Sequence, residues 1–217
     1  MNKRANLKIE KSKLILVEGT DATYFMIWAL QAIDCCREEI QVMNFGGNSD
    51  LKSFLQILKL DDNFSEVTDI LIFRDAENNP VGAQDSVVNS LRSVGYELRE
   101  KKPFKTEKFI RTRIGFGIFP GAISGAQDLS TIGTLEDLCL RMISDEGLLD
   151  FANETLEQAK SAGFNFSKVH KTKLYLYLAL KDGCQGLKLG EAAKVGIWNW
   201  RSKFFEPYIA LIQEICA

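Results

Sequence analysis

Histidine is almost absent from this chain, in which His170 is the only one. A zinc site built from several histidines is therefore excluded, and a Ser-His-Asp triad would have to use this single residue. The sequence also lacks a glycine-rich loop followed by Lys-Ser or Lys-Thr. That absence excludes a P-loop NTPase, because such a loop and its lysine hold the nucleotide phosphates. We expect His170 and Lys171, which precede a predicted helix, to lie at the surface.

Long apolar runs and paired cysteines are missing as well. No run approaches the roughly 20 residues needed to span a bilayer, and the basic start at residues 1–6 is not followed by the apolar core of a signal peptide. The five cysteines form no CxxC pair, which is typical of reduced, packed thiols in a cytosolic protein. These observations predict a soluble, cytoplasmic protein with no membrane partner.

Charge is nearly balanced over the whole chain but not locally. The net charge is −2 over 217 residues, which is not that of a polycation built for nucleic acid. Residues 99–113 nevertheless contain seven basic and two acidic residues, a local net of +5. A charge run of this kind is usually a solvated face, but it also suits contact with a phosphate backbone. The candidate residues for that contact are Lys101, Lys102, Lys105, Arg111 and Arg113.

The first 120 residues alternate strand and helix patterns. Short β-rich runs predict strands at residues 14–17, 40–45, 69–73 and 114–119, and amphipathic segments predict helices at 21–36, 51–60 and 81–94. Residues 96–98 are either a strand or a lead into the basic segment. This alternation is typical of βαβ units, so we expect a Rossmann-like, three-layer α/β fold with a mainly parallel sheet.

After residue 133 the pattern becomes helical. Helices are expected at residues 134–143, 148–162, 167–181 and 206–215. Thr134 suits the cap of the first of them, with Asp137 as its partner three residues on. We therefore divide the chain into an α/β domain, residues 1–132, and a helical extension, residues 133–217, packed on the same core.

Two acidic clusters follow expected strands. The first strand leads into Glu18 and Asp21, and the third leads into Asp75 and Glu77. Ligands of open α/β sheets bind beyond the carboxyl ends of the strands, so both clusters share a crevice if their strands are neighbours. Converging carboxylates repel one another and favour a cation, and oxygen ligands favour Mg²⁺, Mn²⁺ or Ca²⁺. Asp21 also suits the N-cap of the helix that follows.

The order of three motifs resembles the Toprim domain, which topoisomerases, primases and small nucleases share. The motifs are Glu18-Gly19-Thr20-Asp21 after the first strand, Gly46-Gly47 after the second, and Asp75-Ala76-Glu77 after the third. This resemblance covers roughly residues 12–140. The chain is also similar to small stand-alone Toprim-like proteins of bacteria and archaea, and that narrower similarity includes residues 133–136 and the C-terminal helices.

The resemblance implies a division of roles among four acids. Glu18 transfers a proton and also reaches the metal, Asp75 and Glu77 hold Mg²⁺ or Mn²⁺, and Glu136 approaches a second metal. The chain departs from the family pattern at Glu77, where the family has an aspartate. Because Mg²⁺ demands near-ideal octahedral geometry, the longer side chain retunes or weakens the site.

Four further residues complete the expected site. Gly19 and Asp21 support the acids, and Asp21 acts as the helix cap. Gly46 and Gly47 are candidates for close approach to phosphate, although a turn is the favoured explanation of a glycine pair. The partners that the resemblance implies are DNA or RNA, together with an ATPase or a defence-system protein.

The expected function is Mg²⁺-dependent phosphoryl transfer, nuclease-like, on phosphodiester bonds of DNA or RNA. The alternative is a non-catalytic module that keeps the fold and binds nucleic acid or protein, which the acidic pI of about 5.6 and the glutamate at position 77 favour. A phosphatase or phosphotransferase with Asp75 as nucleophile is less favoured. Such enzymes usually place the nucleophilic aspartate after the first strand, where this chain has Glu18.

Overall fold

A five-stranded sheet in the order β2-β1-β3-β5-β4 lies at the centre of the protein. The structure is a computed structural model that describes residues 8–35, 37–47, 49–122 and 131–216. Its strands are β1 (Lys13–Val17), β2 (Ile40–Asn44), β3 (Asp69–Asp75), β4 (Lys105–Lys108) and β5 (Arg113–Phe119). All pairs are parallel except β4 with β5. The expected α/β fold with a mainly parallel sheet is confirmed, and β1 lies directly beside β3.

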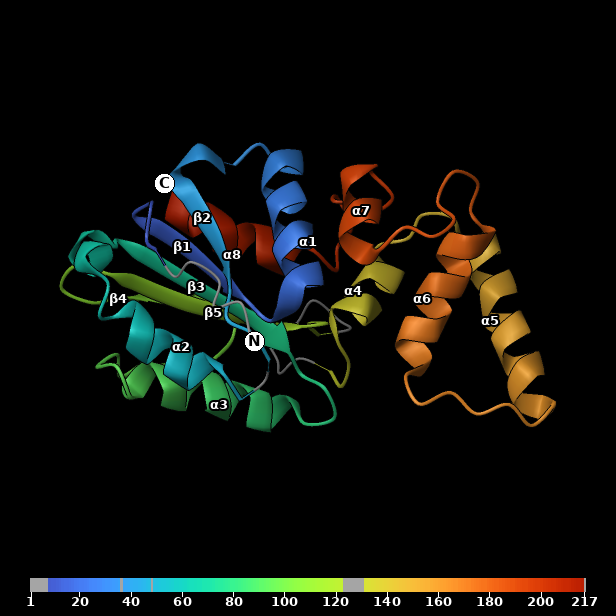
Figure 1. The fold of residues 1–217 in the computed structure, drawn as a ribbon, viewed down its shortest axis with the longest axis horizontal. Coiled ribbons are helices and arrows are strands. Elements are labelled where there is room, and N and C mark those ends of the chain that lie inside the picture. Colours follow the sequence, from blue (N-terminus) through green and yellow to red (C-terminus); the bar gives the residue numbers. More distant parts are fainter. Residues whose placement is uncertain (1–7, 36, 48, 123–130, 217) are drawn as a thin grey trace.

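Helices cover both faces of this sheet (Figure 1). On one face lie α1 (Gly19–Ala32) and α8 (Glu206–Cys216), and on the other lie α2 (Leu51–Leu58) and α3 (Pro80–Arg92). Successive side chains of a strand point to opposite faces. In β3, Leu71 and Phe73 accordingly pack into the core on the α1 side, while Ile70 and Ile72 pack into the core on the α2 side. A strand buried on both faces has to be apolar along its length.

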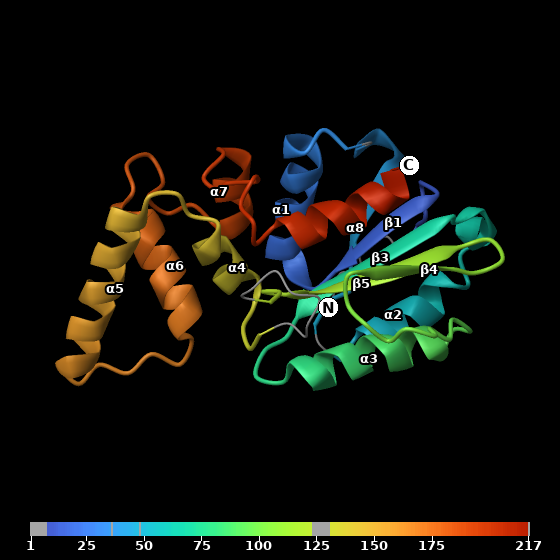
Figure 2. The same ribbon diagram turned by 180° about the vertical axis from the view of Figure 1, so that it is seen from behind.

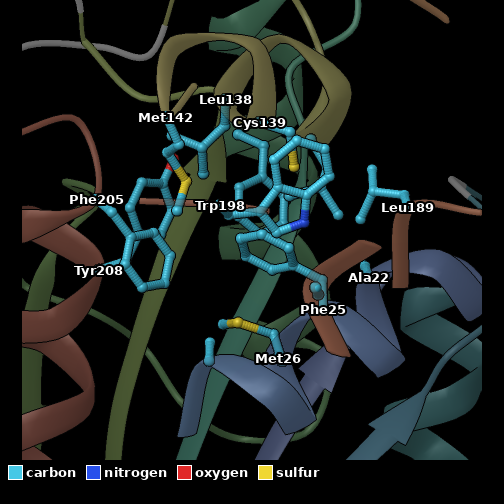
Figure 3. Close-up of a cluster of buried hydrophobic side chains, with 14 of the residues drawn as sticks. Ala22, Phe25, Met26, Leu138, Cys139, Met142, Leu189, Trp198, Phe205 and Tyr208 are labelled. Carbon is cyan, nitrogen blue, oxygen red and sulfur yellow. The ribbon is translucent and has the colours of Figure 1, made fainter. Parts of the chain in front are cut away.

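Four helices lie between residue 133 and α8, and each contributes buried side chains to the hydrophobic core on the α1 side of the sheet. They are α4 (Leu135–Arg141), α5 (Glu146–Ser161), α6 (Val169–Leu180) and α7 (Leu189–Lys194). In Figures 1 and 2, α4 and α7 lie near α1, whereas α5 and α6 form a hairpin that extends away from the sheet. Figure 3 shows Phe25 of α1, Leu138 of α4, Leu189 of α7 and Tyr208 of α8 in one cluster around Trp198. These helices and the sheet thus share a hydrophobic core.

The start of α1 corrects one expectation. The helix begins at Gly19 with Glu18 in the N-cap position, and Asp21 lies in its first turn. The expectation that Asp21 caps this helix is therefore wrong, although a carboxylate in the first turn still interacts favourably with the helix dipole. The cap expected further along is confirmed, because Thr134 and Asp137 form a capping box in which the Thr134 N–H donates to Asp137 Oδ2 at 2.8 Å.

Two elements differ from the patterns expected in the sequence. Residues 96–98 are not a strand but lead into the basic segment, which is one of the two alternatives that the sequence left open; the strand inside that segment, β4, was not expected. Its sequence is Lys-Thr-Glu-Lys, and charged residues on an edge strand discourage pairing with other chains. The short helix α7 was not expected either. Among the described residues, no helix has the length and apolar character needed to cross a membrane.

The cysteines follow two patterns. Cys139 and Cys184 are buried free thiols, as expected. Cys35 and Cys216 instead form a disulfide that joins the end of α1 to the end of α8, so the expectation of reduced thiols is wrong for this pair. The bond is possible because α1 and α8 lie on the same face of the sheet (Figure 2). Cys36 lies outside the described residues.

Candidate functional site

The carboxyl ends of β1 and β3 bring Glu18 and Asp75 to the same edge of the sheet. Val17 and Phe73 are partners in the parallel register, and the N–H of Glu18 donates to Phe73 O at 3.2 Å. Glu18 directly follows β1, and Asp75 is the last residue of β3. The two acids, which the sequence placed after separate strands, therefore lie at the ends of neighbouring strands. This is the arrangement that a shared ligand site between them requires.

Glu18 is a partly buried carboxylate with an incomplete set of partners. Its Oε2 is buried and has no hydrogen-bond partner among the described residues, and the Nε of buried Arg74 is 3.8 Å away. Burial raises the pKa of Glu18, while Arg74 and the backbone N–H of Asp75 act in the opposite direction. A carboxyl group with a raised pKa is closer to the range in which it can exchange a proton at neutral pH.

Asp75 is a far weaker acid than an ordinary aspartate. Burial and then the charge of Glu136 raise its pKa from 3.8 to about 8, with smaller contributions from Glu18 and Glu77. Its Oδ1 accepts the N–H of Leu135, the first residue of α4, at 2.8 Å. This hydrogen bond opposes the rise and joins the end of β3 to the start of α4. Asp75 is accordingly a proton-binding group at neutral pH unless a cation replaces the proton.

Glu136 is the most deeply buried acid of this group, with 5% of its surface exposed. The Nζ of Lys171, on α6, lies 2.9 Å from its Oε1, and the hydroxyl of Thr134 donates to its Oε2 at 2.7 Å. Burial opposes ionisation, but these two hydrogen bonds, the backbone N–H of Glu136 and the charge of Lys171 together outweigh it, so that the pKa of Glu136 is lowered. Glu136 thus keeps its charge and raises the pKa values of Asp75 and Asp21.

Glu77 lies on an exposed turn beyond β3. Its φ is +51°, in the left-handed region that non-glycine residues rarely adopt. The conformation is fixed by two backbone hydrogen bonds of 2.8 Å with Gly133, one in each direction. Its charge contributes to the raised pKa values of Glu18 and Asp75, so Glu77 borders the crevice from the solvent side.

The glycines of the expected site belong to a hydrogen-bonded turn. Asn44, the last residue of β2, accepts the N–H of Gly19 at 3.0 Å and that of Gly46 at 2.8 Å. The N–H of Gly47 donates to Asp50 Oδ2 at 2.9 Å. Because these N–H groups have partners inside the protein, the structure favours the turn explanation of Gly46 and Gly47, and Gly19 supports the site through its link to Asn44.

The basic candidates are spread along β4 and β5 rather than gathered at the crevice. Asp75 pairs with Phe119 at the carboxyl end of β5, whereas Arg113 lies at the opposite end, beside Asp69, with which it forms an ion pair of 3.4 Å. Arg111 precedes it, and Lys105 on β4 pairs with the middle of β5. Lys101 and Lys102 are exposed and precede β4. Arg111 and Arg113 are therefore not brought together with the acids.

The carboxylates fit a loosely held cation better than a complete metal cage. Among the described residues, no group of three or more His, Cys, Asp or Glu is arranged to hold a metal ion. Mg²⁺ is commonly bound by one or two carboxylates, with water and substrate phosphate completing its shell. Glu18, whose buried Oε2 makes no hydrogen bond, and Asp75, whose charged form is disfavoured by burial and by neighbouring acids, fit this arrangement. Glu136 fits it less well because Lys171 already balances its charge.

Three residues of the site were missed in the sequence. Arg74 is 2% exposed and reaches toward Glu18. Lys171, expected to be an ordinary surface residue, instead reaches the buried Glu136, and Asn44 joins two loops. A charged residue at the end of a buried apolar run was a usable signal for Arg74. No local pattern signals Lys171, because Glu136 is distant in the sequence, and none signals the bond of Asn44 to the distant Gly19, although its other partner, Gly46, is only two residues away.

The fold and the site together define an α/β protein with a mainly parallel sheet and partly buried acids at two neighbouring strand ends. Residues 12–217 match the family described as a protein of unknown function (DUF3226), and the chain belongs to that family. A search of the curated proteins found no match, and a search of the solved structures found none either. The description of the family names no activity, so the function has to be argued from the site.

Proposed function

We propose that this protein is a Mg²⁺- or Mn²⁺-dependent phosphoryl-transfer enzyme, nuclease-like, that acts on phosphodiester bonds of DNA or RNA. The observation that carries the proposal is the position of Glu18 and Asp75 at the carboxyl ends of adjacent parallel strands. Both acids have raised pKa values, and the buried Oε2 of Glu18 faces Arg74 at 3.8 Å but makes no hydrogen bond. The resemblance of the three motifs to the Toprim domain supports it. The same proposal includes a cytoplasmic location and an ATPase or defence-system protein as partner.

The roles follow from the environment of each acid. A bound cation would offset the negative charge of the phosphate and of the attacking and leaving oxygens. Glu18 and Asp75 would hold it, and Glu77 would complete the shell from the solvent side. Glu18 is the proposed proton carrier because burial raises its pKa, and the adjacent Arg74 keeps it oriented. Glu136, held by Lys171, sets the electrostatic potential at Asp75.

The test is a nuclease assay with Mg²⁺ or Mn²⁺ on single- and double-stranded DNA and RNA. Glu18→Gln should lower the rate by about 10²- to 10⁴-fold, as expected for loss of a general acid or base. Glu157→Gln, which changes an exposed carboxylate on α5, is the matched control and should keep the wild-type rate. Equal trace activity in wild type and Glu18→Gln would mean that the activity comes from a contaminant and that the proposal is wrong.

A non-catalytic binding module is the second candidate function. The absence of a ready-made three-ligand group in the described part of the chain and the ion pair that occupies Glu136 favour it. Titration calorimetry with Mn²⁺ separates the two functions. Heat of binding that disappears in Asp75→Asn supports the enzyme, whereas no binding at millimolar Mn²⁺ supports the module.

A further inference from the structure

A pocket that neither Glu18 nor Asp75 lines is built from aromatic side chains of α1 and α6 together with residues of α7. It has a volume of about 630 Å³, within the usual range for small-molecule sites. Tyr24 and Trp28 of α1 line it together with Tyr175 of α6. Tyr24 and Tyr175 keep 52% and 37% of their surfaces exposed, so their rings are available to a ligand. Aromatic walls of this kind favour a flat, apolar or π-rich group.

The close approach of α7 to α1 shapes this pocket. Gly190 of α7 is buried, and a Cβ added there would lie 2.4 Å from the Cβ of Tyr24. Only a residue without a side chain allows this close approach. The Cβ of Tyr24 therefore lies directly against the backbone of α7 at Gly190. Figure 1 shows α7 next to α1. The position of Tyr24 therefore depends on the tertiary packing of two helices.

Charged groups of both signs surround the aromatic walls. Lys194 of α7 and Lys188, which precedes that helix, line the pocket, and the Nζ of Lys194 lies 5.7 Å from the centroid of the Trp28 ring. Glu191 and the partly buried Asp21 supply carboxylates. A planar heterocycle with N–H donors and an attached anion matches this set, because the rings stack on it, a carboxylate accepts its donors and the lysines bind its charge.

Asp21 connects this pocket with the candidate site. It lines the pocket, and its pKa is raised by burial and then by the charge of Glu136, the same acid that acts on Asp75. Asp21 lies in the first turn of α1, which follows Glu18 directly, so one end of the pocket is formed by the turn of helix that follows the candidate site.

We propose that the pocket between α1, α6 and α7 binds a nucleotide, with its base between Tyr24, Trp28 and Tyr175 and its phosphate beside Lys188 and Lys194. The proposal deepens the proposed function, on which it rests for the choice of a nucleic-acid strand as the natural ligand. The pocket would then hold one base of the strand whose backbone passes the crevice. A free nucleotide has the same chemistry, and the experiment separates the two sources.

The test measures binding without turnover, in EDTA, so that it does not depend on metal or catalysis. Fluorescence anisotropy follows labelled single-stranded DNA and RNA oligonucleotides, and calorimetry follows free nucleoside monophosphates. Tyr24→Leu and Tyr175→Leu should each weaken binding roughly five- to hundredfold, the range expected for one stacked base. Lys194→Gln should reduce the slope of log K against log salt by about 0.7 for a lost phosphate contact to a single strand.

The matched control is Phe164→Leu, which removes a 64% exposed aromatic ring outside the pocket and should leave binding unchanged. Circular dichroism confirms that each variant is folded, and the exposed Lys194 provides a variant that does not disturb packing.

Stronger binding of oligonucleotides than of monophosphates assigns the pocket to a strand, and the reverse assigns it to a free nucleotide. The proposal is overturned if neither ligand binds at millimolar concentration, or if the tyrosine variants bind like Phe164→Leu. Binding of a nucleotide without any nuclease activity would contradict the proposed enzymatic function but would still support the nucleotide site in the pocket.

Discussion

Replacement of Asp75 by asparagine tests how the site is built. Burial and the charge of Glu136 raise the pKa of Asp75 from 3.8 to about 8. Its Oδ1 accepts the Leu135 N–H at 2.8 Å, and an amide oxygen can accept the same bond. Asp75→Asn thus removes the charge and keeps the hydrogen bond. We expect the variant to be more stable than the wild type at neutral and alkaline pH, although it removes a proposed catalytic group.

The sign and size of the effect follow from proton linkage. Between pH 3.8 and about 8, the folded protein holds a proton on Asp75 that the unfolded chain has released, so stability falls as pH rises through this window. At 1.36 kcal/mol for each pKa unit, the charge on Asp75 lowers the free energy of unfolding of the wild type by at most about 6 kcal/mol. Water reaches this partly exposed side chain, and screening reduces the expected gain to about 3 kcal/mol.

Urea unfolding followed by circular dichroism measures this gain. The free energy of unfolding of Asp75→Asn should exceed that of the wild type by about 1.5 kcal/mol near pH 6 and by about 3 kcal/mol near pH 9. Asp150→Asn, at an exposed position of α5, is the control and should change the free energy of unfolding by less than about 0.5 kcal/mol. If Asp75→Asn is less stable than wild type, or its advantage does not depend on pH, the Asp75 carboxyl is not strained by its neighbours and the reasoning fails.

Two further substitutions test the packing around the site. Lys171→Met leaves Glu136 buried without its 2.9 Å partner and should lower the free energy of unfolding by about 2 kcal/mol at pH 7. Because the pKa of Glu136 is lowered in the fold, the stabilisation is complete above pH 4.5 and is lost as the pH falls through that lowered value; urea midpoints on both sides of this window measure it. Gly190→Ala places a Cβ 2.4 Å from the Cβ of Tyr24 and should cost about 1–3 kcal/mol, measured by thermal unfolding.

Each of these substitutions has a matched control elsewhere in the chain. Lys160→Met removes the partner of Glu157 in an exposed ion pair of 2.6 Å and should cost less than about 1 kcal/mol. Gly147→Ala, on α5 where nothing lies within 4 Å of the added Cβ, should be neutral or stabilise the protein by up to about 1 kcal/mol. If Lys160→Met loses as much free energy of unfolding as Lys171→Met, the buried ion pair is not the cause of the loss. If Gly147→Ala loses as much as Gly190→Ala, the close contact between helices is not the cause.

Local patterns were sufficient for β1, β2, β3 and β5 but not for β4. The apolar runs of β1 and β3 are continuous because both faces of these strands are buried. β4 has no such run, because its four residues are charged or polar and partly or fully exposed. α7 was missed because its six residues are too few to show a helical period. The pairing of Lys171 with Glu136 joins residues on α6 and α4 and has no local signal.

The sequence by itself determined that a mainly parallel α/β sheet forms and that Glu18 and Asp75 lie at the ends of two of its strands, because apolar periodicity and turn residues are local properties of the chain. The tertiary structure decided that those strands are neighbours, that Asp75 holds its proton at neutral pH and that Glu136 keeps its charge. The physical reason is that the pKa of a carboxylate depends on its burial and its partners. Thr134 and Glu77 are near in sequence to the acids on which they act, but Lys171 reaches Glu136 from α6, and Glu136 reaches Asp75 from α4.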